Sequence, residues 1–305
     1  MTILTDKNPP VSIVVITYNS SAFVLETLES AKNQTYRNIE LIISDDASQD
    51  DTVEICQQWL KKNKERFLRT EVVTVKENTG IPANCNRGAK ASSGEWVKLI
   101  GGDDLLLQNC IEDNMRYAVK NSSTFIVSEV LEFIGTFKTT KNKWICTIPQ
   151  KFLKTRTPKE QFLFFLSGNG YLPGSAFFIN KSLLSSVGWF EESYKSVEDR
   201  PLLLKITFND LFIYKLEKIT VAHRRHSAGL TNKKSFPYYL LDVFKAVITF
   251  SKLSGQGVYL FNGYWHYYIL NLQTKISYSV IERVLNYIRV HLQPIRLLRL
   301  KDLES

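Results

Sequence analysis

The amino-acid sequence predicts an α/β fold, in which helices flank a mostly parallel central sheet and a helical C-terminal region follows. Two observations support this prediction. Over the first hundred residues, apolar β-branched segments alternate with segments of helical periodicity, as they do in consecutive βαβ units. Polar or acidic residues directly follow three of the apolar segments. In a parallel sheet the loops after the strands share one edge, which is where such sheets bind ligands.

The first half of the chain supplies four predicted strands. Residues 11–16 are apolar and β-branched, which is typical of a buried strand. The other predicted strands cover residues 39–44, 71–75 and 95–100. Helices are predicted between them, over residues 23–31, 53–60 and 81–91. Asp51 and Glu54 resemble a capping box at the start of the second helix.

The second half of the chain is less regular. Strands are predicted over residues 125–132, 144–148, 213–222 and, after a turn at residues 173–175, up to residue 179. A short helix over residues 181–187 should end at Gly188, and Pro201 suits the first turn of a helix that opens at residue 198. Beyond residue 233 the pattern is helical, and an amphipathic helix is predicted from Ile281 to Ile295. We therefore predict two domains, residues 1–232 and residues 233–305.

The composition is that of a globular protein with an uneven positive charge. Apolar residues make up 44% of the chain and charged residues 23%, which argues against disorder. The net charge is +9, and the segment from Lys275 to Lys301 contains six lysines and arginines but only one acidic residue. The four cysteines are far apart without a CxxC pair, so we expect no zinc site and a reduced, cytoplasmic location. The polar N-terminus and the lack of a long apolar run predict neither a signal peptide nor a membrane span.

Two adjacent carboxylates, Asp103 and Asp104, follow the fourth predicted strand after a pair of glycines. Two like charges side by side repel each other unless a cation lies between them. Carboxylate and phosphate oxygens are the ligands that Mg²⁺ and Mn²⁺ prefer. The segment therefore predicts a divalent metal site with phosphate ligands, and the alternative is a solvated Asp-Asp turn.

Several ordered motifs over residues 11–232 carry a resemblance to a known family. They are VSIVVITYN, ISDDASQD, NTGIPANCNRG, GGDD, PGSAFFI, GWFEE, EDRP and RRH. In their order and spacing the chain resembles the inverting family-2 glycosyltransferases with the GT-A fold, as found in bacterial polysaccharide and O-antigen assembly. The resemblance implies a Rossmann-like GT-A sheet for the first domain.

The resemblance also implies roles for the donor site. Thr17, Tyr18 and Asn19 would line the nucleoside pocket, and Asp46 would read the edge of the base, commonly uracil. Asp45 would support them. For Asp46 the alternative is a cap on the following helix, and for Tyr18 it is packing.

The remaining implied roles concern the diphosphate and the reaction. Asp103 would contact the ribose, and Asp104 would bind the metal. Arg225 and His226 would lie near the pyrophosphate or the metal. Asp199, preceded by Glu198, would be the catalytic base. Asp199 could also cap the helix that begins there, and His226 could be a structural histidine.

The chain departs from the family pattern at two positions. Many relatives have an Asp where this chain has Gly101, which leaves one fewer acidic candidate for the metal. Relatives also often have an Arg where this chain has Cys85. That change removes a candidate phosphate contact, for which Arg87 or a C-terminal residue could substitute.

These residues suit one in-line displacement. A single carboxylate can take the proton of the acceptor hydroxyl, and a divalent metal with a nearby Arg or His can stabilise the leaving nucleotide diphosphate. The predicted activity is metal-dependent, inverting transfer of a hexose from a nucleotide sugar, expected to be a UDP-sugar, to a glycan or a lipid-linked acceptor. Alternatives are a nucleotidyltransferase, which residues 17–21 disfavour because they lack a Gly-rich basic loop, and a basic nucleic-acid-binding protein, for which no motif is present.

The basic C-terminal region leaves two interpretations open. It could pack on the catalytic domain as a helical cap. Alternatively, it could rest on the cytoplasmic leaflet of a membrane and face a lipid-linked acceptor, with Tyr264, Trp265, Tyr267 and Tyr268 at the depth of the lipid headgroups.

Overall fold

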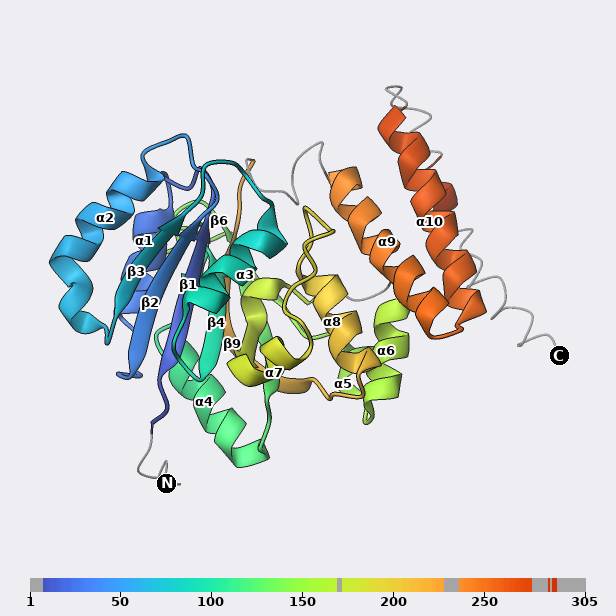
Figure 1. Ribbon diagram of the computed structural model, residues 1–305, viewed down its shortest axis with the longest axis horizontal. Coiled ribbons are helices and arrows are strands. Elements are labelled where there is room, and N and C mark those ends of the chain that lie inside the picture. The colour runs from blue at the N-terminus through green and yellow to red at the C-terminus, as the bar shows by residue number, and fades with distance from the viewer. Residues whose placement is uncertain (1–7, 169–171, 228–235, 276–284, 286, 290–305) are drawn as a thin grey trace. The chain divides into compact units, whose positions relative to one another are not determined.

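The computed structural model describes residues 8–168, 172–227, 236–275, 285 and 287–289 (Figure 1). Strands and helices alternate through the first half of the chain. The strands are β1 (Val11–Thr17), β2 (Ile39–Asp45), β3 (Thr70–Thr74), β4 (Trp96–Gly101) and the short β5 (Leu105–Leu106). The helices are α1 (Val24–Lys32), α2 (Thr52–Asn63), α3 (Ile81–Ala91) and α4 (Cys110–Asn121), with a 3-10 turn η1 (Lys64–Arg66). Strands β1 to β4 and helices α1 to α3 match the predicted alternation, whereas β5, α4 and η1 were not predicted.

The second half contains longer strands and two long helices. Its strands are β6 (Phe125–Ile134), β7 (Lys143–Cys146), β8 (Phe177–Asn180) and β9 (Tyr214–Arg225). Its helical elements are α5 (Gln150–Leu153), α6 (Pro158–Leu166), η2 (Gly174–Ala176), α7 (Lys181–Ser186), α8 (Asp199–Phe208), α9 (Phe236–Leu253) and α10 (Gly257–Lys275). As predicted, α7 gives way to Gly188 with a positive φ of 79°. The predicted amphipathic helix from Ile281 to Ile295 lies almost entirely outside the described residues.

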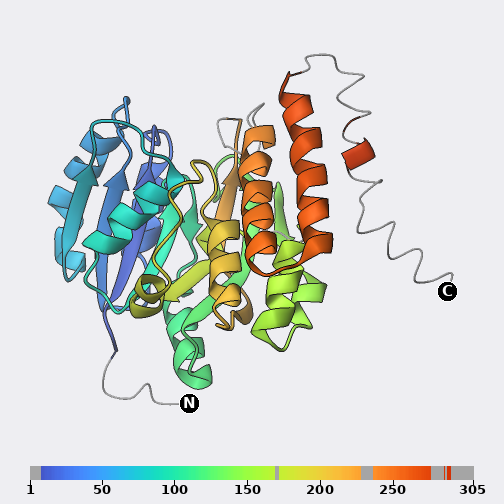
Figure 2. The ribbon, with the colours of Figure 1, turned by 45° about the vertical axis from the view of Figure 1, so that its right-hand side comes forward.

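One mixed sheet carries the described strands in the order β3-β2-β1-β4-β8-β6-β9-β5, with β7 paired to β6. The first four strands of this order pair in parallel. The pairs β4–β8, β8–β6 and β9–β5 are antiparallel, whereas β6 and β9 are parallel. Helices α1 and α2 cover one face of the parallel part and α3 covers the other (Figure 2). The α/β fold with a helix-flanked sheet is thus confirmed, and its parallel part lies in the first half of the chain.

The sheet core explains the sequence pattern of the parallel strands. In β1 and β2 nearly every residue is buried on both faces, including Ile13, Val14, Leu41 and Ile42. Strands covered on both faces need continuous apolar runs rather than alternation. Since the strands are parallel and in register, their carboxyl ends, from Thr17 to Asp45, meet at one edge.

The start of α2 differs from its prediction. Asp51 is the N-cap residue, but its side chain makes no capping hydrogen bond, so the predicted capping box is wrong. Asp50 takes that role instead, because its carboxylate accepts the N–H groups of Thr52 and Ser21, each at 3.1 Å. Because Asp50 lies one residue closer to β2 than Asp51 does, its carboxylate can reach both the start of α2 and the loop after β1.

The chain divides into two compact units, the first made of residues 1–153, 171–199 and 213–226, and the second of the remainder. The first unit holds the whole sheet. In the second, α9 and α10 form an antiparallel pair, in which Gly263 packs against Val247 and Ile248, and His266 stacks on Phe244 at 4.3 Å. Within the described ranges, no helix combines the length and apolar character needed to cross a membrane. The predicted boundary at residue 232 stays a prediction.

Candidate active site

Thr17 and Asp45 join the ends of β1 and β2. The hydroxyl of Thr17 donates to Oδ2 of Asp45 at 2.7 Å, and both residues are buried. The Ser48 backbone N–H and hydroxyl donate to the same carboxylate, at 2.9 and 2.5 Å. Asp45 therefore holds the turn after β2, as its predicted supporting role requires.

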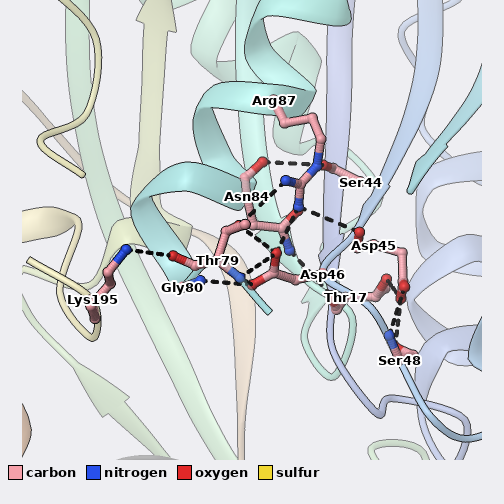
Figure 3. Close-up of polar contacts among 10 residues, drawn as sticks. All are labelled: Thr17, Ser44, Asp45, Asp46, Ser48, Thr79, Gly80, Asn84, Arg87 and Lys195. Carbon is pink, nitrogen blue, oxygen red and sulfur yellow. Dashed lines mark hydrogen bonds and ion pairs between the residues drawn. The ribbon is translucent and has the colours of Figure 1, made fainter. Parts of the chain in front are cut away.

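Asp46 points to a different loop from Asp45. Its carboxylate accepts the Thr79 hydroxyl at 2.6 Å and the Gly80 N–H at 2.9 Å (Figure 3). The Thr79 N–H lies 3.0 and 3.1 Å from the two oxygens, and Nη2 of Arg87 donates to Oδ1 at 2.9 Å. Asp46 thus binds the loop before α3 and one side chain of α3, and it does not cap α2.

These hydrogen bonds keep Asp46 ionised. Burial alone would raise the pKa of Asp46, but the hydrogen bonds from Thr79, Arg87 and Gly80 lower it below its ordinary value. An ionised carboxylate offers about four lone-pair positions and no donor. Thr79, Gly80 and Arg87 occupy them all in this structure, so a new donor must replace an existing one.

Arg87 differs from the sequence expectation. Its guanidinium also donates to Oδ1 of Asn84 at 2.9 Å and lies 3.3 Å from the hydroxyls of Ser44 and Thr79. The side chain is therefore held against Asp46 and is not extended toward a phosphate site. It supports the carboxylate rather than replacing the contact missing at Cys85.

Tyr18 and Asn19 lie in the turn after β1. Tyr18 is 50% exposed, so its ring is not packed in the core. Asn19 has a positive φ of 50°, which Asn tolerates better than most residues. Its backbone N–H donates to Ser48 Oγ and its Oδ1 accepts the Gln49 N–H, both at 2.8 Å. Asn19 thereby ties the loop after β1 to the loop after β2.

The pairing of β5 with β9 builds a second cluster around Asp104. Leu105 pairs with Ala222, so the preceding Asp104 meets the residues that follow Ala222. Nδ1 of His223 lies 2.9 Å from Asp104 Oδ2, and the Arg224 backbone N–H donates to Oδ1 at 2.9 Å. Burial and the charge of Asp103 raise the pKa of Asp104, whereas the carboxylate of Asp104 raises the pKa of His223 against the effect of burial.

Asp103 is the more accessible of the two adjacent carboxylates. Its side chain is 33% exposed, whereas that of Asp104 is 4% exposed. Nε2 of His226 lies 2.8 Å from Asp103 Oδ2. Burial favours the neutral acid, but the bond from His226 and the nearby imidazole charges lower the pKa of Asp103. A Cβ at position 101 would lie 2.7 Å from Asp103 Oδ1, so the glycine found there leaves room for this carboxylate.

Arg224 and Arg225 point in opposite directions, as neighbours in a strand do. Arg224 is almost fully buried, with its guanidinium between the rings of Phe23 and Phe133 at 4.7 and 4.6 Å. Its Nε donates to the Asp103 carbonyl at 2.9 Å. Arg225 makes a bidentate contact with Glu132, at 2.6 and 2.9 Å. The role predicted for Arg225 at the diphosphate stays a prediction, with its guanidinium held by Glu132 in this structure.

Asp199 begins α8 and is buried, with Pro201 in the first turn as predicted. The preceding Glu198 packs against Gly174, where a Cβ would lie 2.2 Å from Oε1. Burial, and next the charge of Asp199, raise the pKa of Glu198 to about 8. The pair therefore brings together one carboxyl that holds its proton at neutral pH and a second acidic group beside it.

Asp103 and Asp104 are the residues at this sheet edge whose carboxylates could take part in holding a divalent ion. Among the described residues, no group of three or more His, Cys, Asp or Glu side chains is arranged to hold a metal by itself. Mg²⁺ commonly takes only one or two carboxylates from the protein and fills its other positions with phosphate and water. Two carboxylates and the imidazoles of His223 and His226 at one sheet edge offer that chemistry.

Sequence reasoning missed His223, Arg224, Thr79 and the orientation of Arg87. His223 directly precedes the RRH motif that ends in His226, so its position was a usable signal. The direction of Arg224 and Arg225 depends on the phase of β9, which neighbouring identical residues do not reveal. Thr79 and Arg87 both stand in the motif NTGIPANCNRG, but the motif does not indicate that they contact Asp46.

Comparisons with known proteins show the family of the chain. Residues 12–188 match the family model described as glycosyl transferase family 2. The glycosyltransferase EpsH of Bacillus subtilis is 35% identical over 133 residues, or 44% of this chain, and the chain spans 37% of the length of EpsH.

Two solved structures share the fold. Residues 1–349 of Staphylococcus aureus TarS, in complex with UDP-GlcNAc, give a TM-score of 0.62 at 19% identity, covering 83% of this chain and 71% of that one. The mannosyltransferase PcManGT of Pyrobaculum calidifontis, in complex with GDP-Man and Mn²⁺, gives a TM-score of 0.60 at 17% identity, covering 80% and 65%. Since the family model matches more than half of the chain, this protein belongs to glycosyl transferase family 2.

Proposed function

We propose that this protein transfers a hexose from a UDP-sugar, with inversion, to a hydroxyl of a glycan or of a lipid-diphosphate-linked sugar. The observation that carries this proposal is the placement of Asp46 and of the Asp103–Asp104 pair after strands β2 and β4 of one sheet, whose carboxyl ends form a single edge. TarS and PcManGT, which share the fold, were solved with UDP-GlcNAc and with GDP-Man and Mn²⁺.

Asp46 would select the base of the donor. Its ionised carboxylate only accepts hydrogen bonds, so it favours a base that offers an N–H on its edge, as uracil does at N3. The Thr79 hydroxyl is the donor that can rotate away to admit such a base, because the Thr79 and Gly80 backbone groups and Arg87 are fixed by their own elements. Thr17, Tyr18 and Asn19 would form the wall of the nucleoside pocket.

Asp104 would bind a divalent Mn²⁺ or Mg²⁺ ion, with Asp103 on the ribose side and His226 beside the diphosphate. A metal ion bound there stabilises the charge that develops on the leaving nucleotide diphosphate. The residues of the chain would meanwhile hold the donor at the sheet edge. Arg224 anchors the Asp104 carboxylate through its backbone N–H and the main-chain carbonyl of Asp103 through its Nε, so the placement of both residues does not depend on the ion.

Asp199 would act as the general base. As the acceptor oxygen bonds to the anomeric carbon, the bond from that carbon to the phosphate oxygen breaks, and the hydroxyl proton moves to Asp199. One displacement of this kind inverts the anomeric configuration. Positioned proton transfer of this type typically contributes about 10²–10⁴-fold to a rate.

The acceptor would be presented at a membrane surface in cell-surface polysaccharide synthesis. Helix α10 exposes Val258, Phe261, Tyr268 and Leu272, which recur at helical spacing on one side of the helix. Residues 254–274 contain no charged side chain, and the basic segment from Lys275 onward would add attraction to anionic lipid. Sedimentation with liposomes, with and without anionic lipid, tests this part separately.

Calorimetric titration of UDP, GDP and dTDP, first with Mn²⁺ and then with EDTA, tests the donor site. We expect UDP to bind in the presence of the metal and to be released by EDTA. Equal binding of all three nucleotides would contradict the role of Asp46, and binding that survives EDTA would contradict the metal site. A product analysis with UDP-hexoses and a lipid-diphosphate sugar then tests transfer and its stereochemistry.

A further inference from the structure

Lys98 is a fully buried lysine in the middle of the sheet. It lies in β4, is 0% exposed and ranks among the largest fully buried side chains of the described residues. Lysine is almost never fully buried unless it is paired. No described carboxylate pairs with it. Its Nζ instead donates to two main-chain carbonyls, those of Ser175 at 2.7 Å and Phe177 at 3.2 Å.

Stability alone does not account for this side chain. Burial lowers the pKa of Lys98, which reflects the cost of keeping an ammonium group out of water. A buried ammonium group without a carboxylate partner carries a desolvation cost that an apolar side chain of similar size does not carry. The pairing of β4 with β8, which aligns Lys98 with Phe178, needs only the backbone of Lys98.

The carbonyls that Lys98 holds belong to the turn that supports Glu198. Ser175 lies in η2, which begins at Gly174, and Phe177 begins β8 three residues after Gly174. Oε1 of Glu198 sits so close to Gly174 that a Cβ there would lie 2.2 Å away. The turn is therefore a wall of the space that the Glu198 carboxyl occupies, next to Asp199.

No described cation fixes Glu198 by an ion pair. The buried thiol of Cys85 is near enough that Glu198 raises the pKa of Cys85, and Asp199 is the other titratable neighbour. The position of the Glu198 carboxyl thus depends on the packing of its walls rather than on charge pairing.

From this geometry we infer that Lys98 is a positioning residue for sugar transfer: it holds the turn at residues 174–177, which in turn places Glu198 beside Asp199. The inference rests on the proposed function of Asp199 as the base. It assigns Lys98 no contact with either substrate. Lys98 would thereby control the position of Glu198 and Asp199, where the acceptor is proposed to bind, without changing the residues proposed to bind the nucleotide sugar.

Lys98→Met tests the inference, because methionine keeps most of the volume and removes the donor. We expect the melting temperature and the affinity for UDP to stay close to wild type. The kcat should fall by about tenfold or more, since a displacement of about 1 Å at a reacting group can cost 10²-fold. Gly174→Ala should give the same result by another route, because its methyl group displaces the Glu198 carboxyl directly.

Lys181→Met is the matched control. Lys181 also donates its Nζ to a main-chain carbonyl, that of Ser92, but it is partly exposed and does not support the turn at Gly174. Its variant should keep the wild-type kcat. If Lys98→Met also keeps the wild-type kcat, or loses stability, UDP binding and kcat together, the inference is wrong.

A readout without catalysis separates this inference from the proposed function. The melting temperature of wild type should depend on pH through Glu198, and both Lys98→Met and Gly174→Ala should shift that dependence, whereas Lys181→Met should not. If Lys98→Met and Gly174→Ala shift the pH dependence of the melting temperature but the wild-type protein transfers no sugar, the proposed function is wrong and the placement of Glu198 by Lys98 is supported. If neither variant shifts it, the placement by Lys98 fails.

Discussion

Asp104 and His223, 119 residues apart in the chain, face each other at 2.9 Å across the antiparallel pair of β5 and β9. Only two residues of β5 pair with β9, yet this short pairing sets the register that places His223 and Arg224 on Asp104. The adjacent carboxylates of Asp103 and Asp104 would repel each other if they had no partners. The imidazoles of His226 and His223, each within hydrogen-bond distance of one of them, offset this repulsion.

Asp104→Ala should abolish the metal-dependent part of UDP binding. The variant removes the proposed metal ligand and leaves the base-reading residues after β2 untouched. We expect the calorimetric affinity for UDP to become equal with Mn²⁺ and with EDTA. Asp51→Ala, which removes an exposed carboxylate without a capping bond, is the control. An unchanged response to Mn²⁺ in Asp104→Ala would rule out Asp104 as the ligand.

Arg87→Met should weaken UDP binding without changing the response to metal. The variant removes the charge-assisted hydrogen bond that Arg87 donates to Asp46, so the buried carboxylate of Asp46 is less stabilised. Such bonds contribute about 1.5–3 kcal/mol, which corresponds to roughly 10–100-fold in affinity. Calorimetry with UDP measures the loss, and Arg116→Met, at a solvent-exposed helix pair with Glu112, serves as the control. Full UDP affinity in Arg87→Met would show that Asp46 does not depend on Arg87.

Asp199→Asn should keep donor binding and lose transfer. The amide preserves the shape of the side chain but cannot take the acceptor proton, so we expect kcat to fall by about 10²–10⁴-fold. Asp210→Asn, at an exposed position after α8, is the control. Transfer at the wild-type rate would mean that another group is the base.

Glu198 should make the protein less stable as the pH rises. Its pKa in the folded protein is about 8, whereas an unfolded glutamate titrates near 4.3. Between these values the folded state binds a proton that the unfolded state has lost, so the stabilisation is complete below about pH 4 and is lost through pH 8. Glu198→Gln should flatten the melting temperature between about pH 5 and 8. Parallel curves for the variant and wild type would contradict the raised pKa.

Glu40 should have the opposite pH dependence. Although burial would raise its pKa, hydrogen bonds from Ser12, Ser93 and Gly94 lower it below its ordinary value. Its stabilisation is therefore present above about pH 4.3 and is lost as the pH falls through the lower folded value. Glu40→Gln should also cost about 1–3 kcal/mol at neutral pH, because the amide keeps one acceptor oxygen but replaces Oε2, which accepts from the Ser93 hydroxyl and from Arg69, by an NH2 group. Urea unfolding at pH 7 and at pH 3 measures both effects, and an equal deficit at the two values would contradict the assignment.

The sequence predicts the parallel half of the sheet better than the rest because its strands are continuous apolar runs separated by one helix each. Strands β1 and β2 begin at their predicted residue and end one residue later than predicted, and β4 is shifted by one residue. The pairing of β5 with β9 was not predictable, because two leucines carry no periodic signal and their partner lies more than a hundred residues away. The same holds for Asp46 and Arg87, whose contact depends on how α3 packs on the sheet.

The sequence also does not show which of two adjacent, chemically similar residues makes a given contact. Asp50 and Asp51 both suit the start of α2, and only the loop after β1 decides in favour of Asp50. Arg224 and Arg225 both suit a diphosphate, and the phase of β9 alone decides which of them is buried.

The strand order has a consequence for how the protein matures. Strands β1 to β4 come from the first hundred residues and can form their parallel pairs as soon as they leave the ribosome, whereas β9 completes the edge at Asp104 only after residue 225 has been made. Nascent chains that carry the parallel half alone would hold Asp46 in place while Asp104 still lacks its imidazole partner. The Asp104 edge would thus be completed only after about three quarters of the chain has been made.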